Sequence, residues 1–135
     1  MTWPSGAHAN TFGGNPLAVA AALATIRLLE GGLIDNASEV GEHMQARLRT
    51  WLDRYDFVGD VRGKGLMLGV DIVSDKESKA GDHELRDRIV GDSFKKGLLL
   101  LGAGPSTIRL CPPLTLDKAT ADEGLAVMEK VMDAL

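Results

Sequence analysis

A polar stretch near the start of this 135-residue chain, residues 8–16, holds the side chains best suited to binding an anion. Its sequence is His-Ala-Asn-Thr-Phe-Gly-Gly-Asn-Pro. Thr11 supplies a hydroxyl donor, and Gly13 and Gly14 let the backbone come close to a ligand because they carry no side chain. This combination favours contact with a phosphate group. A pair of glycines before a helix is also typical of a plain entry turn, so both interpretations stand at this level.

The end of this stretch predicts the start of a helix. Asn15 is a favoured N-cap residue, and Pro16 suits the first helical position, where a missing N–H costs nothing. The helix should therefore begin near Leu17. Unsatisfied N–H groups and the positive end of the helix dipole gather at such a start, and both favour a bound anion.

Other residues could take part in chemistry, but the local pattern favours a structural role for each. Arg62 and Lys64 flank a glycine turn and could hold an anion, although charges at such places are usually solvated. Arg109 shares one face of a predicted strand with Thr107 and Cys111, which is the position of an exposed charge. Cys111 is the single cysteine, so it cannot form an intramolecular disulfide, and we expect it to be a small buried side chain.

Composition excludes several classes of protein. The net charge of −4 and the absence of a dominant Lys/Arg cluster argue against nucleic-acid binding. No apolar run approaches the ~20 residues of a membrane span, and the N-terminus lacks the pattern of a signal peptide. The single cysteine fits a reducing compartment. The expectation is a cytoplasmic domain with no nucleic-acid or membrane partner.

The first half of the chain predicts helices of opposite character. Residues 17–30 are apolar nearly all round and have high helix propensity, which is typical of a helix covered on several sides. Gly31 and Gly32 should end this helix. A second helix, capped by Asp35 and running to about Arg54, has one apolar stripe and an opposite polar face. The stripe consists of Ala37, Val40, Met44, Leu48, Trp51 and Leu52.

The second half predicts short strands and further helices. Gly97 should end the helix at 85–96, and Pro112 and Pro113 should end the strand before them because proline cannot donate to a ladder. Strands are predicted at 57–61 and 66–73 around a turn at 62–65, followed by a loop at 74–82. The helix at 85–96 has the apolar positions Leu85, Ile89, Val90 and Phe94. Two further strands are predicted at 98–101 and 107–111, and a last helix is capped by Asp117.

The resulting order is α-α-β-β-α-β-β-α. It predicts an α+β fold, a two-layer α/β sandwich in which a small, mostly antiparallel sheet is covered by helices on one side.

Three blocks of sequence in this order resemble one known family. They are His8 with Thr11–Ala18, Val61–Gly69, and Ile108–Thr115. The pattern resembles the C-terminal part of class III, fold-type I aminotransferases that depend on pyridoxal 5′-phosphate (PLP), and it looks most like 4-aminobutyrate aminotransferases. The resemblance extends from about Trp3 to the end of the chain.

The resemblance implies roles at specific positions. Thr11 matches the family threonine whose hydroxyl and backbone N–H bind the cofactor phosphate in the active site of the neighbouring subunit, and Gly13 and Gly14 shape this cofactor-binding loop. Arg109 matches the arginine that holds the substrate carboxylate. The implied protein is a homodimer with shared active sites that acts on an amino acid and a 2-oxo acid and uses no metal.

The resemblance also implies what this chain lacks. The family lysine that forms the Schiff base with PLP lies upstream of the Thr11 loop, and no lysine here sits in a matching motif. We therefore expect no catalytic residue in this chain, with residues 1–32 as active-site loop and connecting helix and residues 33–135 as the small C-terminal domain. By itself the chain should be inactive, and its parent should move an amino group from an ω-amino acid such as 4-aminobutyrate to a 2-oxo acid.

Other readings stay open from the sequence. Related PLP racemases and mutases share the same blocks. The chain could also be a free-standing regulatory domain that binds an anion, or a dimerisation domain whose apolar first helix pairs two copies.

Overall fold

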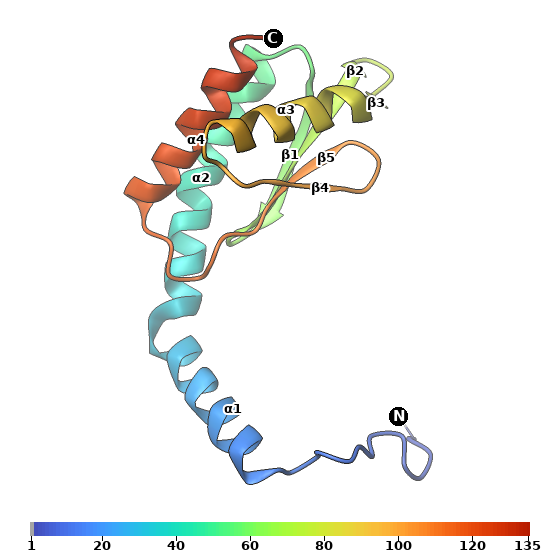
Figure 1. The fold of residues 1–135 in the computed structure, drawn as a ribbon, viewed down its shortest axis with the longest axis vertical. Helices are drawn as coiled ribbons and strands as arrows, with labels where there is room; N and C mark the ends of the chain where they lie inside the picture. The colour runs from blue at the N-terminus through green and yellow to red at the C-terminus, as the bar shows by residue number, and fades with distance from the viewer. Residues whose placement is uncertain (1) are drawn as a thin grey trace. The chain divides into compact units, whose positions relative to one another are not determined.

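A computed structural model describes residues 2–135 and divides the chain into two compact units, Met1–Gly32 and Leu33–Leu135 (Figure 1). The first unit contains consecutive turns followed by α1 (Pro16–Leu28). As expected, Asn15 caps this helix: its side-chain oxygen accepts from the N–H of Leu17 at 3.0 Å and of Ala18 at 3.3 Å. A short π-helical segment, η1 (Leu29–Leu33), follows, and Gly32 breaks the helical conformation there with a φ of +127°.

The surface of α1 is apolar and none of its residues is buried. Leu17 is 81% exposed and Leu28 is 63% exposed. The helical run Pro16–Arg54 contains an 18-residue window with a mean hydropathy of 1.8, so by length and composition it could cross a membrane. This corrects the expectation that no segment has those properties. A helix that other protein covers has the same composition, so the finding does not by itself indicate a membrane.

The second unit begins with α2 (Ile34–Arg54), the long amphipathic helix that the sequence predicts. Its apolar stripe is buried, with Leu48 and Trp51 fully inaccessible to solvent. The predicted cap is wrong: Leu33 occupies the N-cap without a side-chain hydrogen bond, and Asp35 lies inside the first turn. Because the chain enters α2 from η1 and not from an extended segment, no residue there has the geometry of a cap.

The sheet is antiparallel throughout, in the order β1-β2-β5-β4. A short strand lies within the predicted loop at 74–82. It pairs with the last residues of β2, beyond the part of β2 that pairs with β5. The strands are β1 (Val58–Lys64), β2 (Met67–Asp75), β3 (Ala80–Gly81), β4 (Leu101–Ala103) and β5 (Thr107–Leu110).

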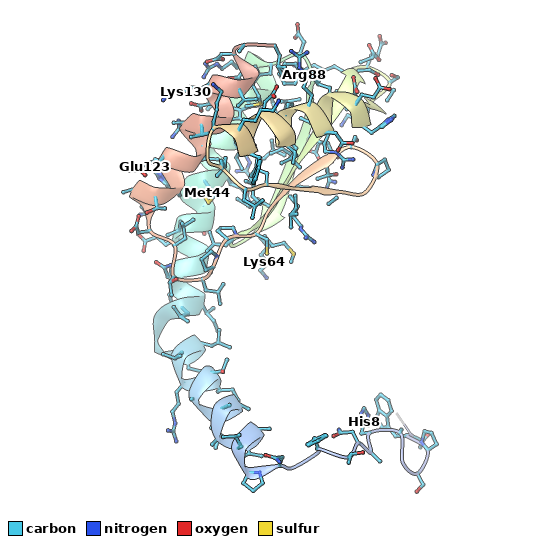
Figure 2. All side chains as sticks on the ribbon, in the orientation of Figure 1. His8, Met44, Lys64, Arg88, Glu123 and Lys130 are labelled. Carbon is cyan, nitrogen blue, oxygen red and sulfur yellow. The ribbon has the colours of Figure 1, made fainter. Side chains whose placement is uncertain are left out.

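Two strands, β1 and β4, differ most from their predicted bounds, while β2 and β5 shift by at most two residues at either end. β1 continues through Arg62 to Lys64, so the charges assigned to a turn lie on a strand, and Lys64 stands at the tip of the hairpin (Figure 2). β4 begins at Leu101, and the apolar residues 98–100 before it are not paired. Within this run only Leu100 is buried, and Leu99 is 75% exposed, so the apolar run predicts neither the ladder nor burial along its whole length.

Helices α2 and α3 (His83–Lys95) pack on one face of the sheet. Helix α4 (Lys118–Met132) packs on these two helices, and Figure 1 shows α2 and α4 side by side. Asp117 caps α4, as the sequence predicts. Asp82 caps α3. On α3 the predicted apolar face is partly wrong, since Phe94 is 67% exposed and Ser93 is buried in its place. The helix-facing residues of the strands form the core, including Leu68, Val70, Ile108 and Leu110.

A charged cluster joins α2 to α4. Arg47 donates to both carboxylate oxygens of Glu129, at 2.9 and 2.7 Å, and Trp51 Nε1 donates to the same carboxylate at 2.9 Å. The Glu129 side chain is only 16% exposed. Partial burial acts to raise the pKa of Glu129. The hydrogen bond from Arg47 outweighs this effect and holds the pKa below its usual range.

The hairpin of β1 and β2 also packs closely on α2. A Cβ built at Gly41 on the helix would lie 2.2 Å from the carbonyl oxygen of Gly65 in the hairpin turn. Gly65 itself has a φ of +53°, which glycine adopts without strain. Only a residue without a side chain therefore fits at position 41.

We expect Gly41→Ala to destabilise the chain by about 2 kcal/mol, because the clash with backbone outweighs the gain of about 1 kcal/mol in helix propensity. The matched control is Gly91→Ala on α3, where an added Cβ meets nothing within 4 Å. That substitution should raise stability by up to about 1 kcal/mol. Urea unfolding of both variants measures the difference, and a Gly41→Ala chain as stable as the original would contradict the close contact.

Glu129 should also contribute to acid sensitivity. Because its pKa in the folded chain is lowered from 4.5, its stabilising effect is complete above that pH and is lost as the pH falls through the folded value. Glu129→Gln should cost about 1–2 kcal/mol near neutral pH and flatten the loss of stability in acid. Glu123→Gln, on the outer side of the same helix (Figure 2), is the control and should keep the original acid profile. Denaturant melts from pH 3 to pH 7 test the pair.

Candidate functional site

The glycine loop of the first unit presents free hydrogen-bond donors. Thr11 is exposed, and within residues 2–135 neither its hydroxyl nor its N–H has a hydrogen-bond partner. The loop is folded by turns in which Gly13 N–H donates to Asn10 O at 3.2 Å and Asn15 N–H to Phe12 O at 3.1 Å. Gly14 has a φ of +73°. The two donors of Thr11 suit one side of a phosphate group.

One part of the anion-binding prediction is wrong. The first amides of α1 do not point to an open site, because the Asn15 side chain accepts from Leu17 and Ala18. Pro16 has no N–H at all. The N-cap that starts the helix therefore satisfies the donors that would otherwise receive an anion, and Thr11 keeps both a hydroxyl and an N–H unpaired.

Arg109 lies on β5 in the second unit, on the sheet face that the helices of this unit do not cover. Its neighbours across the strands are Gly69 on β2 and Leu101 on β4. The side chain is exposed, and within the described residues it has no hydrogen bond or ion pair. Cys111 is exposed as well, which corrects the expectation that it is buried. Both follow from the alternation of β5, whose buried members are Ile108 and Leu110.

The same open face carries a connected polar cluster beside Arg109. Arg62 on β1 binds the Asp71 carboxylate with both of its terminal nitrogens, one at 3.0 Å, and also binds Asp60 at 2.9 Å. The Thr107 hydroxyl donates to Asp71. Burial of Asp71 acts to raise its pKa, but the hydrogen bonds from Arg62 and Thr107 outweigh this and hold the pKa below its usual range. Arg62 is thus fully paired and not available to an anion.

A groove of about 310 Å³ opens where β5 ends, between the strand ends and helices α2 and α4. Its lining is almost entirely apolar, and Arg109 is the one charged residue in it. Most of this lining faces the helices, whereas the Arg109 side chain extends from the opposite face of β5, so the groove is not assigned to its guanidinium. The described residues include no group of His, Cys, Asp and Glu that could hold a metal ion.

The lysines of the chain are all exposed. A lysine that acts as a nucleophile or base near neutral pH needs a lowered pKa, which burial or a neighbouring cation provides. Lys118 and Lys95 instead form ion pairs with Glu39 and Asp92. Each lysine that the structure describes is thus open to solvent.

Sequence reasoning missed the cluster around Asp71. Arg62 was expected in a turn, so its strand partner was not considered. A signal was nevertheless present, because the alternation of β2 places Asp71 on the same face as Gly69, opposite the buried Val70.

Comparison with known proteins places these features in one family. The family model described as "Aminotransferase class-III" matches residues 1–132. Acetylornithine aminotransferase of Gloeobacter violaceus is 43% identical over 96% of this chain and 31% of its own length. Leucine/methionine racemase of Thermococcus litoralis is 40% identical over 93% of this chain and 28% of its own length. 4-Aminobutyrate aminotransferase of Mycobacterium leprae is 38% identical over 90% of this chain and 28% of its own length.

Solved structures agree. An aminotransferase from Bacillus anthracis superposes with a TM-score of 0.87 at 31% identity, covering 95% of this chain and 30% of that one. An amine transaminase from an uncultivated Pseudomonas species, in its PLP-bound form, gives a TM-score of 0.86 at 36% identity over 94% and 29%. The chain thus spans only 28% to 31% of the length of the relatives it matches. The chain belongs to the class-III aminotransferase family.

Proposed function

We propose that this chain is the C-terminal part of a cytoplasmic PLP-dependent transaminase that moves an amino group from an amino acid to a 2-oxo acid, with an ω-amino acid such as 4-aminobutyrate as donor. The observation that carries the proposal is the unpaired guanidinium of Arg109 on an exposed sheet face, in a chain of the class-III aminotransferase family. Both substrates of such a reaction are carboxylates. A single guanidinium can therefore serve both half-reactions.

In this proposal the loop of the first unit holds the phosphate of PLP. The hydroxyl and N–H of Thr11 donate to phosphate oxygens, and Gly13 and Gly14 keep side chains away from them. We assign this loop to the active site of a neighbouring subunit in a homodimer. The exposed apolar surface of α1, none of whose residues is buried, supports such an assembly, because other protein would cover it.

Arg109 orients the substrate in the second unit. Its planar fork can bind a carboxylate through two parallel hydrogen bonds, which fixes both the position and the rotation of the bound acid. Bound PLP supplies the electron sink for the chemistry at the substrate carbon–nitrogen bond. The residues of this chain bind and orient, and none is assigned a proton-transfer step.

The proton-transfer lysine is placed in the part of the relatives' length that this chain does not span. The exposure of every lysine in the chain supports this assignment. Residues 1–32 then serve as active-site loop and connecting helix, and residues 33–135 as the small C-terminal domain. The chain alone is expected to be inactive even with added PLP.

A racemase is the second candidate. Leucine/methionine racemase of Thermococcus litoralis and alanine/serine racemase of Pyrococcus horikoshii are 40% and 41% identical to this chain. Both reactions begin with a carboxylate-bearing amino acid, so the roles of Thr11 and Arg109 are the same in either case.

The full-length protein that carries this chain, loaded with PLP, should form glutamate from 4-aminobutyrate and 2-oxoglutarate. The 135-residue chain with added PLP should form none, because it has no lysine suited to proton transfer. Chromatography of the products measures both. Inversion of L-leucine or L-alanine without an oxo acid would instead select the racemase, and transfer by the chain alone would contradict the placement of the lysine.

Thr11→Val in the full-length protein should weaken PLP binding about tenfold or more, because a donor to a charged phosphate is lost while side-chain size is kept. Thr11→Ser keeps the hydroxyl and is the control, with binding close to the original. Absorbance titration of the cofactor-free protein with PLP gives the dissociation constants. Unchanged binding by the valine variant would remove Thr11 from the phosphate site.

A further inference from the structure

Arg62 and Arg109 occupy equivalent positions on the two sides of β2. The register pairs Arg62 of β1 with Gly69, and Gly69 with Arg109 of β5. Both arginines therefore stand in one cross-strand row on the open face of the sheet. Gly69 between them has no side chain to separate them.

Asp71 lies two residues beyond Gly69 on the same face of β2, so it is the diagonal neighbour of both arginines. Diagonal neighbours in an antiparallel sheet are about 7–8 Å apart, within the reach of long side chains. Arg62 and Arg109 can thus compete for the same carboxylate from opposite sides.

The structure shows which arginine holds it. Arg62 binds both oxygens of Asp71, and the Thr107 hydroxyl donates to one of them. The side chain of Asp71 is 25% exposed, which leaves little room for a further donor. The Arg109 side chain has no partner within the described residues, although it is diagonal to Asp71 in the same way as Arg62 is.

We propose that Arg62 is a positioning residue for the carboxylate site. By saturating Asp71 together with Thr107, it withholds the nearest acidic side chain on that face from Arg109 and keeps the Arg109 guanidinium available to the substrate. This inference rests on the proposed role of Arg109 as the carboxylate-binding residue.

The consequence of losing Arg62 follows from the partial burial of Asp71. A half-buried carboxylate without a cation is costly, and recruiting a second guanidinium relieves that cost. Arg109 would then turn toward Asp71 and be lost to the substrate. Removing the carboxylate as well would release Arg109 again.

The first test measures the availability of Arg109 directly, in the full-length protein without substrate. An arginine-selective dicarbonyl reagent modifies free guanidinium groups, and mass spectrometry of the Arg109 peptide gives its rate of modification. Arg62→Met should slow the reaction of Arg109 several-fold, and the double variant Arg62→Met/Asp71→Asn should restore it. Arg54→Met breaks a comparable exposed pair with Asp133 between the helices and should have no effect.

The second test is kinetic and separates this inference from the proposed function. Arg62→Met should raise the KM for the carboxylate substrate about tenfold, with a much smaller change in kcat, and the double variant should recover. Arg109→Met examines the proposed function itself and should raise the same KM at least as much. If it does not, the carboxylate role of Arg109 is wrong, whatever Arg62 does.

The inference about Arg62 is overturned if Arg109 reacts equally fast in the original protein and in Arg62→Met. It is also overturned if the double variant stays as slow as Arg62→Met, because the effect would then come from disturbed folding and not from a released Asp71. Recovery in the double variant is the result that a merely structural role of Arg62 does not produce.

Discussion

Burial of one face of the antiparallel sheet against α2 and α3, with α4 closing the same core from the other helices, is the constraint on which the rest of the second unit depends. Side chains alternate along each strand, so the core residues Val70 and Ile108 fix the register of β2 against β5. A slip by one residue would move these apolar groups to solvent and bring Arg109 into the core. The cost of that exchange holds Arg109 on the open face. The position of the candidate carboxylate site is therefore set by apolar packing on the other side of the sheet.

The helix layer that enforces this register is itself fixed by contacts of different kinds. Gly41 lets the hairpin turn lie directly on α2, where any larger side chain would separate them. Glu129 joins α4 to α2 through Arg47 and Trp51, and its carboxylate is held by three hydrogen bonds in a largely buried place. The close contact depends only on shape, whereas the carboxylate cluster depends on charge. Acid should therefore weaken the contact between α2 and α4 more than the contact between α2 and the hairpin.

Much of this architecture was predictable from the sequence because it follows local rules. The stripe of α2 and the alternation of β5 gave the element types, the buried residues and the α+β class. Boundaries failed where the decisive contact was distant: β4 begins at Leu101 because that is where β5 can pair with it, and Asp35 is no cap because the preceding π segment continues into α2. The loop around Thr11 was recognised as polar and glycine-rich. That Asn15 satisfies the first amides of α1 depends on side-chain geometry, which residue type alone does not give.

The polar face of the sheet shows why a list of charged residues does not identify a binding site. Arg62 and Arg109 are the same residue type, both exposed, in one cross-strand row beside the same carboxylate. They differ in their neighbours. Arg62 faces Asp60 as well as Asp71, so two carboxylates favour its side of β2, whereas Arg109 has Leu101 as its neighbour on the outer strand. An exposed leucine offers no competing acceptor and leaves the guanidinium without a protein partner. If Arg62 keeps Asp71 from Arg109 as proposed, Asp60 on β1 supports the same effect, because it holds Arg62 on its own side of β2.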